Sequence, residues 1–160
     1  MRVSYFLALV ALSLLTMSNS CKKEDDVVPC TTPLAVLEAA QIPGFKASIT
    51  EPVPNLDQSN GYVVNSEAEY RALFAGKKLP PVDFATHTLL AGKTRTATGG
   101  TVLAQLVTQT CTGYKYSVKL APGPAAKAAN VVYYVLVPKL PAEAKIEFDV
   151  QLPQAAAAQR

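Results

Sequence analysis

Side chains that can carry acid–base or nucleophilic chemistry are few and scattered in this sequence. The only histidine is His87, and it lies between Thr86 and Thr88 in a stretch that favours a β-strand. A serine or cysteine nucleophile needs a base beside it, and the acidic residues are too dispersed to indicate a carboxylate pair for glycoside cleavage. We therefore expect no catalytic residue and no enzyme activity, and His87 is the most obvious residue to test for the alternative of an enzyme.

Metal, cofactor and nucleic-acid sites are not indicated either. The sequence has no Cys-x-x-Cys and no His-Glu-x-x-His pattern of the kind that binds zinc. The short turn Thr98-Gly99-Gly100-Thr101 lacks the Gly-Lys that completes a phosphate-binding loop. A formal net charge of +3 is too small to indicate a nucleic-acid-binding domain. We expect no metal, no cofactor and no nucleic-acid partner.

The N-terminal residues indicate an export signal that ends at a cysteine. Arg2 precedes an apolar run from Tyr5 to Met17, which has the length of a signal-peptide core and is shorter than the roughly 20 residues of a transmembrane helix. Ser20 stands directly before Cys21, and the arrangement resembles the lipobox of bacterial lipoproteins, although Ser18 occupies the position where leucine is commonest. The resemblance implies that residues 1–20 are removed and that Cys21 carries lipid. The alternative is an ordinary cleaved signal with a free cysteine nearby.

The residues after Cys21 indicate a tether at a membrane surface. The run from Lys22 to Asp26 is fully charged and resembles the acidic leader of surface-exported lipoproteins of Bacteroidota. Each buried methylene contributes about 0.8 kcal/mol, and two or more acyl chains anchor a protein stably. We therefore expect a lipid-anchored protein of the outer membrane, on its periplasmic or cell-surface face, with residues 21–33 as the tether.

Three cysteines are present, and lipid on Cys21 would leave Cys30 and Cys111 as an even pair in an oxidising compartment. A disulfide between them would close a loop of about 80 residues and stabilise the fold by a little over 4 kcal/mol in the chain-entropy model. The alternative is two separate thiols, one of them buried.

Patterns of period two dominate the rest of the chain. Apolar residues alternate with polar ones from Tyr114 to Leu120 and from Ile146 to Val150, which predicts strands with one buried face. Val131 to Val137 is apolar on both faces and predicts a central strand. We predict a single β-rich domain over residues 34–153, a sandwich or a strongly coiled antiparallel sheet, followed by a flexible tail at 154–160.

One short helix is expected near residues 66–75. Ser66 and Glu69 have the spacing of a capping box, in which each side chain accepts a hydrogen bond from the other residue's backbone N–H. Tyr70, Leu73 and Phe74 then share one face, and Gly76 is placed to end the helix. We expect that apolar face to pack on a sheet.

Residues 60–140 resemble the C-terminal domain family of the PrcB protease-complex subunit. In that family a helix precedes a Pro-x-x-Asp-Phe segment, an apolar strand and a Thr-Gly-Gly-Tyr turn. The matching segments here run in the same order, namely Val64 to Tyr70, Leu79 to Phe84, Leu89 to Lys93, and Thr98 to Gly100. Thr101 replaces the tyrosine, and Arg95 to Ala97 add length before the turn. The resemblance implies a non-catalytic accessory lipoprotein that binds or stabilises an exported protease or surface complex.

Two loops are the expected contact surface, because binding residues concentrate on loops held by a rigid scaffold. These loops are Arg95 to Thr101 and Ala121 to Ala129. The candidate partner-binding residues are Asp83, Phe84, Arg95, Thr98, Gly99, Gly100 and Thr101. The alternative function is a module that binds a cell-surface sugar or small molecule, with a site lined by Tyr62, Tyr114, Tyr116, Tyr133 and Tyr134.

Overall fold

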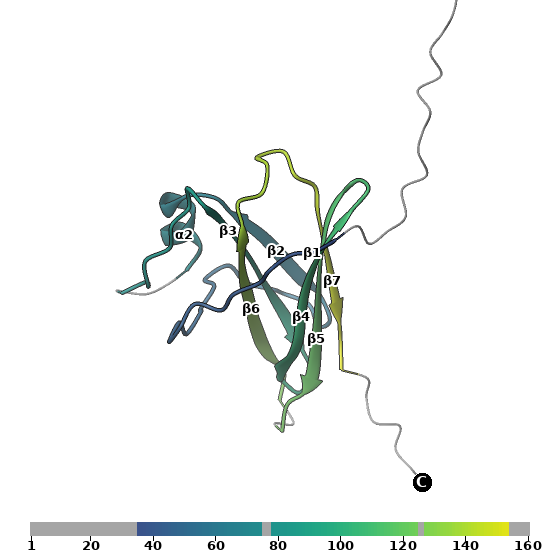
Figure 1. Ribbon diagram of the computed structural model, residues 1–160. Coiled ribbons are helices and arrows are strands. Elements are labelled where there is room, and N and C mark those ends of the chain that lie inside the picture. The colour runs from purple at the N-terminus through teal and green to yellow at the C-terminus, as the bar shows by residue number, and fades with distance from the viewer. Residues whose placement is uncertain (1–34, 75–77, 125–126, 154–160) are drawn as a thin grey trace, which may run out of the picture.

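The computed structural model describes residues 35–74, 78–124 and 127–153, and these form a mainly β fold with seven strands and one helix. In chain order the elements are β1 Ala35–Val36, β2 Ser59–Val64, α2 Glu67–Leu73, β3 His87–Thr96, β4 Gly100–Thr110, β5 Gly113–Pro122, β6 Ala129–Pro138 and β7 Ile146–Gln151. The strands make a four-stranded sheet in the order β1-β4-β5-β7 and a three-stranded sheet in the order β2-β3-β6 (Figure 1). The predicted sandwich with one short helix is confirmed. The predicted signal, Cys21, the tether with Cys30, Gly76 and the tail lie outside the described residues.

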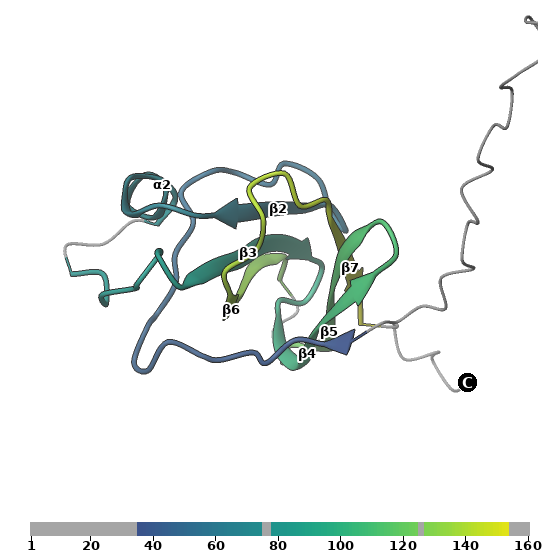
Figure 2. The same cartoon turned by 45° about the horizontal axis from the view of Figure 1, so that its top comes forward.

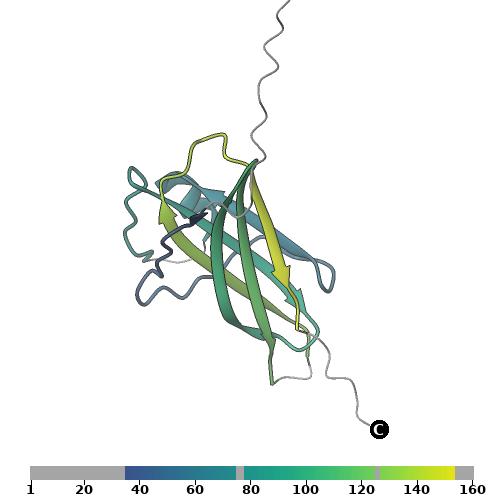
Figure 3. The same cartoon turned by 45° about the vertical axis from the view of Figure 1, so that its right-hand side comes forward.

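The four-stranded sheet is built around the β4–β5 hairpin, which turns at Cys111 and Thr112. Tyr116, Val118 and Leu120 of β5 are buried, as their alternation predicts. The edge strand β7 pairs with β5 in parallel and lies beside it in Figure 3, where β7 is yellow. The other strand pairs of the two sheets are antiparallel.

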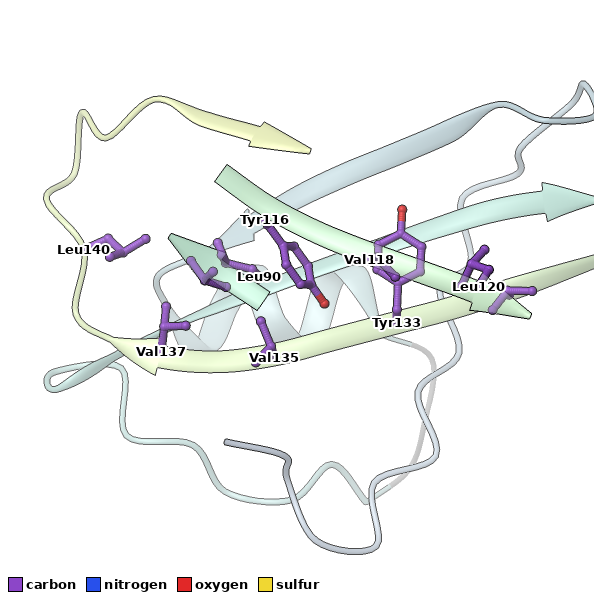
Figure 4. Close-up of a cluster of buried hydrophobic side chains, with 10 residues drawn as sticks. Leu90, Tyr116, Val118, Leu120, Tyr133, Val135, Val137 and Leu140 are labelled. Atoms are coloured by element: carbon purple, nitrogen blue, oxygen red, sulfur yellow. The ribbon is translucent and has the colours of Figure 1, made fainter. Parts of the chain in front are cut away.

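The main core fills the space between the two sheets. Leu90 from β3 and Val107 from β4 meet the inward side chains of β5 and β6 (Figure 4). Tyr116 and Tyr133 pack edge to face in this core, with ring centroids 6.0 Å apart. Fully burying one large apolar side chain contributes about 1.5–3 kcal/mol, so the buried residues of this layer contribute substantially to the fold's stability.

A second apolar layer covers the outer face of the three-stranded sheet. Tyr70 of α2 and its C-cap residue Phe74 are buried there against Leu89 and Ala91 of β3. Ser66 caps the helix by accepting from the Glu69 N–H at 3.3 Å, and a Glu69 carboxylate oxygen accepts from the Asn65 N–H at 2.7 Å. The predicted helix and its packing face are confirmed. The return bond of the capping box goes to Asn65, one residue before the cap.

Strand β6 packs on both faces but is not central. Its side chains point alternately into the core between the sheets and into the second apolar layer, yet the central strand of this sheet is β3. The outer edge of β6 is covered by the segment 35–41, which we call the N-terminal strap. Ala40 exchanges two hydrogen bonds with Leu136, at 2.8 and 2.9 Å, and Gln41 donates to the Tyr134 carbonyl. Because both faces of β6 are covered by apolar layers, this edge strand has the composition of a central one.

The strap also joins the two sheets. Its first residues pair with β4 as β1, and the Leu37 N–H donates to the Val107 carbonyl at 2.9 Å. Figure 2 shows the strap running from the β1 arrow along the sandwich. After the strap, Ile49 forms one isolated antiparallel bridge with Phe74.

Two glycines allow aromatic rings to lie flat on the three-stranded sheet. Gly92 of β3 is the cross-strand partner of Tyr133 in β6, and the Tyr133 ring covers it. Gly61 of β2 lies under the Phe148 ring, which comes from β7 of the other sheet. A side chain at either glycine would occupy the space that the ring fills.

Candidate functional site

The predicted partner-binding residues fall at opposite ends of strand β3. Asp83 and Phe84 precede its first residue, His87, and the turn at Thr98 follows its last, Thr96. Ten residues of strand extend for roughly 30 Å at about 3.3 Å per residue. The two groups therefore belong to separate surfaces and cannot form one compact site.

Asp83 and Phe84 hold the chain in place at the first of these ends. The Asp83 carboxylate accepts hydrogen bonds from the Thr86 hydroxyl at 2.7 Å and from the Ala85 N–H at 3.0 Å. These bonds, the Thr86 hydroxyl first, lower the pKa of Asp83. The Phe84 ring packs on Tyr70, with centroids 5.6 Å apart. His87 contacts the Thr86 hydroxyl through Nδ1 at 2.8 Å, so all these polar contacts join neighbours within one turn.

The turn at the other end of β3 is held rigidly. Gly99 has a φ of +65°, a left-handed conformation that glycine adopts without strain, and its carbonyl accepts from the Thr96 hydroxyl at 2.7 Å and the Thr98 hydroxyl at 3.4 Å. Arg95 donates to the Pro54 carbonyl at 3.1 Å. The polar groups of this turn are used mainly to fix its own shape.

The second predicted loop lies directly against this turn. The Gly123 N–H donates to the Gly99 carbonyl at 3.3 Å, and a Cβ on Gly100 would lie 2.7 Å from the Ala121 carbonyl oxygen. Close backbone approach explains why glycine is required at these positions. We call residues 96–101 and 121–123 together the turn platform. Figure 1 shows these connections at the lower end of the sandwich.

A groove of about 480 Å³ adjoins the turn platform. A β-bulge between Val102 and Ala104 turns Leu103 outward, and 61% of its surface is exposed. We call this hollow the Leu103 groove. Its walls are Leu103, Lys119, Leu120, Ala121, Pro122, Gln151, Leu152 and Pro153. The groove was not predicted from the sequence, although the consecutive apolar residues Val102, Leu103 and Ala104 interrupt the alternation of the strand and are compatible with a bulge.

A second groove, of about 500 Å³, lies between strand β2 and helix α2. We call it the β2–α2 groove. It is lined by Glu51, Gly61, Tyr62, Val63, Val64, Glu69, Ala72 and Leu73. The sequence did not indicate the β2–α2 groove. The groove exists because the outer edge of β2 is open, and strand order cannot be read from local sequence.

The tyrosines do not converge on a ligand site. Tyr116 and Tyr133 are buried between the sheets, where burial raises the pKa of both phenols. Tyr62 and Tyr134 pack on the opposite face of the three-stranded sheet. Burial, followed by the nearby Glu51 carboxylate, raises the pKa of Tyr62, and its hydroxyl has no hydrogen-bond partner among the described residues. Only Tyr62 lines one of the two grooves described above.

Within the described ranges, no group of three His, Cys, Asp or Glu side chains is placed to hold a metal ion. No helix in that part of the chain is long and apolar enough to cross a membrane. Cys111 is disulfide-bonded. Its predicted partner, Cys30, lies outside the described residues, so the pairing stays a prediction.

Comparison of the chain with family models, with curated proteins and with solved structures gave no match. The resemblance to the PrcB C-terminal domain family therefore stays a prediction from the sequence.

Proposed function

We propose that the chain is a non-enzymatic, lipid-anchored protein of the cell envelope that binds an exported protein partner through the turn platform and the Leu103 groove. The observation that carries the proposal is the exposure of Leu103, 61%, in a groove beside a rigid turn. A binding interface needs a central anchor, and an aliphatic side chain in a pocket can serve as one.

The arrangement suits a protein partner for a further physical reason. The hydrogen bonds of Thr96 and Thr98 fix the turn before any partner arrives, so little conformational entropy is lost on binding. Insertion of an apolar side chain of the partner beside Leu103 would bury surface worth about 25 cal/mol per Å². An exported protease is the partner that the sequence resemblance suggests.

The proposal is tested by crosslinked capture from detergent-solubilised native envelopes, with mass spectrometry as the readout. We expect the full chain to recover one exported protein in stoichiometric amount, and the Leu103→Ser variant to lose it. Leu106→Ser is the matched control, because Leu106 lies on the same strand and is 46% exposed but does not line the groove. Equal recovery by the two variants would refute the role of the Leu103 groove.

The membrane anchor needs its own test. We expect the Cys21→Ala variant to leave the detergent phase on phase partition and to lose the mass of the acyl chains, with no change in the melting temperature of the domain. An unchanged mass and partition in this variant would show that Cys21 carries no lipid.

A further inference from the structure

Strand β2 is an edge strand whose outer edge has no backbone partner from another strand of the described residues. Proteins usually shorten, cover or charge such edges, because the unpaired backbone groups template pairing with another strand. Here β1 is two residues long, the strap bonds the outer edge of β6 at Tyr134 and Leu136, and β7 carries Glu147 and Asp149. Strand β2 has six residues, Ser59 to Val64, with no charged residue and no proline.

The unpaired backbone groups of β2 can be assigned to Gly61 and Val63. The Arg95 N–H of β3 donates to the Gln58 carbonyl at 3.2 Å, and the direction of these groups alternates along an antiparallel strand. The backbone N–H and C=O groups of residues 60, 62 and 64 therefore point toward β3. The backbone groups of Gly61 and Val63 point away from it. The Asn65 N–H, which has the same parity, is bonded on the open side by Glu69. Gly61 is exposed, and Val63 is 38% exposed.

The groove beside this edge has a definite chemical character. Val63 and the helix residues Ala72 and Leu73 give it apolar walls, and the carboxylates of Glu51 and Glu69 line it. No basic residue lines the groove, and neither carboxylate forms an ion pair with a described residue. An occupant with backbone donors and acceptors, small apolar side chains and a positive charge would complement all of these groups.

We propose that the β2–α2 groove binds an extended segment of a partner protein, which adds to β2 as a further strand and places a lysine or arginine near Glu51 and Glu69. Main-chain hydrogen bonds to Gly61 and Val63 would supply affinity, and alternate side chains would enter the groove, as in other cases of strand addition. The Glu69 bond to Asn65 closes the end of the open edge, so the added strand pairs no further than Val63. This site is separate from the Leu103 groove and does not depend on it.

The experiment measures binding of two fluorescein-labelled heptapeptides to the purified full chain by fluorescence anisotropy. One peptide alternates valine with lysine, and the other alternates valine with glutamate. We expect the lysine peptide to bind more tightly than the glutamate peptide, and we expect this preference to disappear in the Glu51→Gln/Glu69→Gln variant. Glutamine at 69 keeps an acceptor for the Asn65 N–H, so the helix start is preserved.

The decisive variant is Val63→Pro. Proline removes the outward N–H and blocks the edge, and it is tolerated at edge positions whose N–H does not face the neighbouring strand. We expect the dissociation constant for the lysine peptide to rise by about tenfold, the effect of one lost backbone hydrogen bond. Val63→Thr is the matched control, because it keeps the N–H and the branched side chain, and its binding should stay within about twofold of the parent.

A direct readout is amide hydrogen exchange. The lysine peptide should slow exchange at Gly61 and Val63 and leave Asn65 unchanged. Parent-like binding by a folded Val63→Pro variant would overturn the proposal, and so would equal binding of the two peptides to the parent chain. Concentration-dependent dimerisation that Val63→Pro abolishes would overturn it as well, because the occupant would then be a second copy of this chain.

Discussion

Replacement of Gly92 by alanine should destabilise the fold through the ring of Tyr133. A Cβ at Gly92 would lie 2.6 Å from the Tyr133 hydroxyl oxygen and would also overlap the ring. The ring cannot withdraw freely, because Tyr133 is 1% exposed and packs against Tyr116. Its hydroxyl also bonds the Thr94 hydroxyl at 3.1 Å, and displacement would weaken that bond.

The magnitude follows from three terms. Overpacking of a filled core costs about 1–3 kcal/mol, and the lost hydrogen bond costs about 1 kcal/mol. Alanine also restricts the unfolded chain, which returns about 0.4–1 kcal/mol. We therefore expect the Gly92→Ala variant to lose about 1–3.5 kcal/mol of unfolding free energy.

Urea unfolding followed by far-ultraviolet circular dichroism is the assay, since the chain has no tryptophan. The control is the same substitution in a Tyr133→Val background, which forms a double-mutant cycle. With the ring gone, Gly92→Ala should be neutral or should stabilise by up to about 1 kcal/mol. An equal loss in both backgrounds would refute the reasoning that the ring causes the effect.

Three further predictions concern the helix cap, a pKa and the disulfide. Ser66→Ala removes the acceptor of the Glu69 N–H and should lower the unfolding free energy by about 1 kcal/mol, measured by urea unfolding. Thr86→Val removes the hydroxyl that lowers the pKa of Asp83, so the Asp83 pKa, measured by carboxyl NMR, should rise. A carboxyl whose pKa is lowered by folding stabilises the fold above its unfolded pKa, and this contribution is lost as the pH falls through the folded pKa. Thr86→Val should therefore lose less stability on acidification than the parent chain. Reduction with dithiothreitol should lower the melting temperature, because Cys111 is disulfide-bonded and removing such a bond typically costs about 2–5 kcal/mol.

Each of these has a matched control. Ser66→Asn keeps a good capping acceptor, so a loss equal to that of Ser66→Ala would contradict the capping role. Thr86→Ser keeps the hydroxyl and should leave the Asp83 pKa low. An unchanged melting temperature after complete reduction would show that the disulfide does not stabilise the domain, and peptide mapping that joins Cys111 to a cysteine other than Cys30 would contradict the predicted pairing.

The parts of the fold that the sequence predicted correctly depend on local chemistry. Ser66 and Glu69 cap a helix through contacts within one turn, and the alternation from Tyr114 to Leu120 reports burial of one strand face. Such signals need no knowledge of the rest of the chain. The mainly β class followed from several of them together.

The wrong assignments depend on partners far away in the sequence. Two apolar faces in β6 correctly indicated that both faces are buried. They could not indicate that β6 has a neighbouring strand on one edge only and is bonded by Ala40 on the other. The candidate site residues Asp83 and Gly100 belong to one short stretch of the sequence, and the length of β3 separates them in space. The two grooves arise from a bulge at Leu103 and an open edge at Gly61. Neither feature is predicted by a characteristic residue type.

The strap at residues 35–41 sets an order of events during synthesis. It is made early, but its partners Thr108 and Leu136 are made much later. Contacts between residues so distant in sequence form slowly, because closing a long loop costs entropy before any contact compensates it. The strap can pair with β4 first, but its bonds to Leu136 wait for β6, and β6 presents an open edge at Leu136 until the strap arrives. Docking of the strap is therefore the step at which the new chain stops being prone to aggregation along β6.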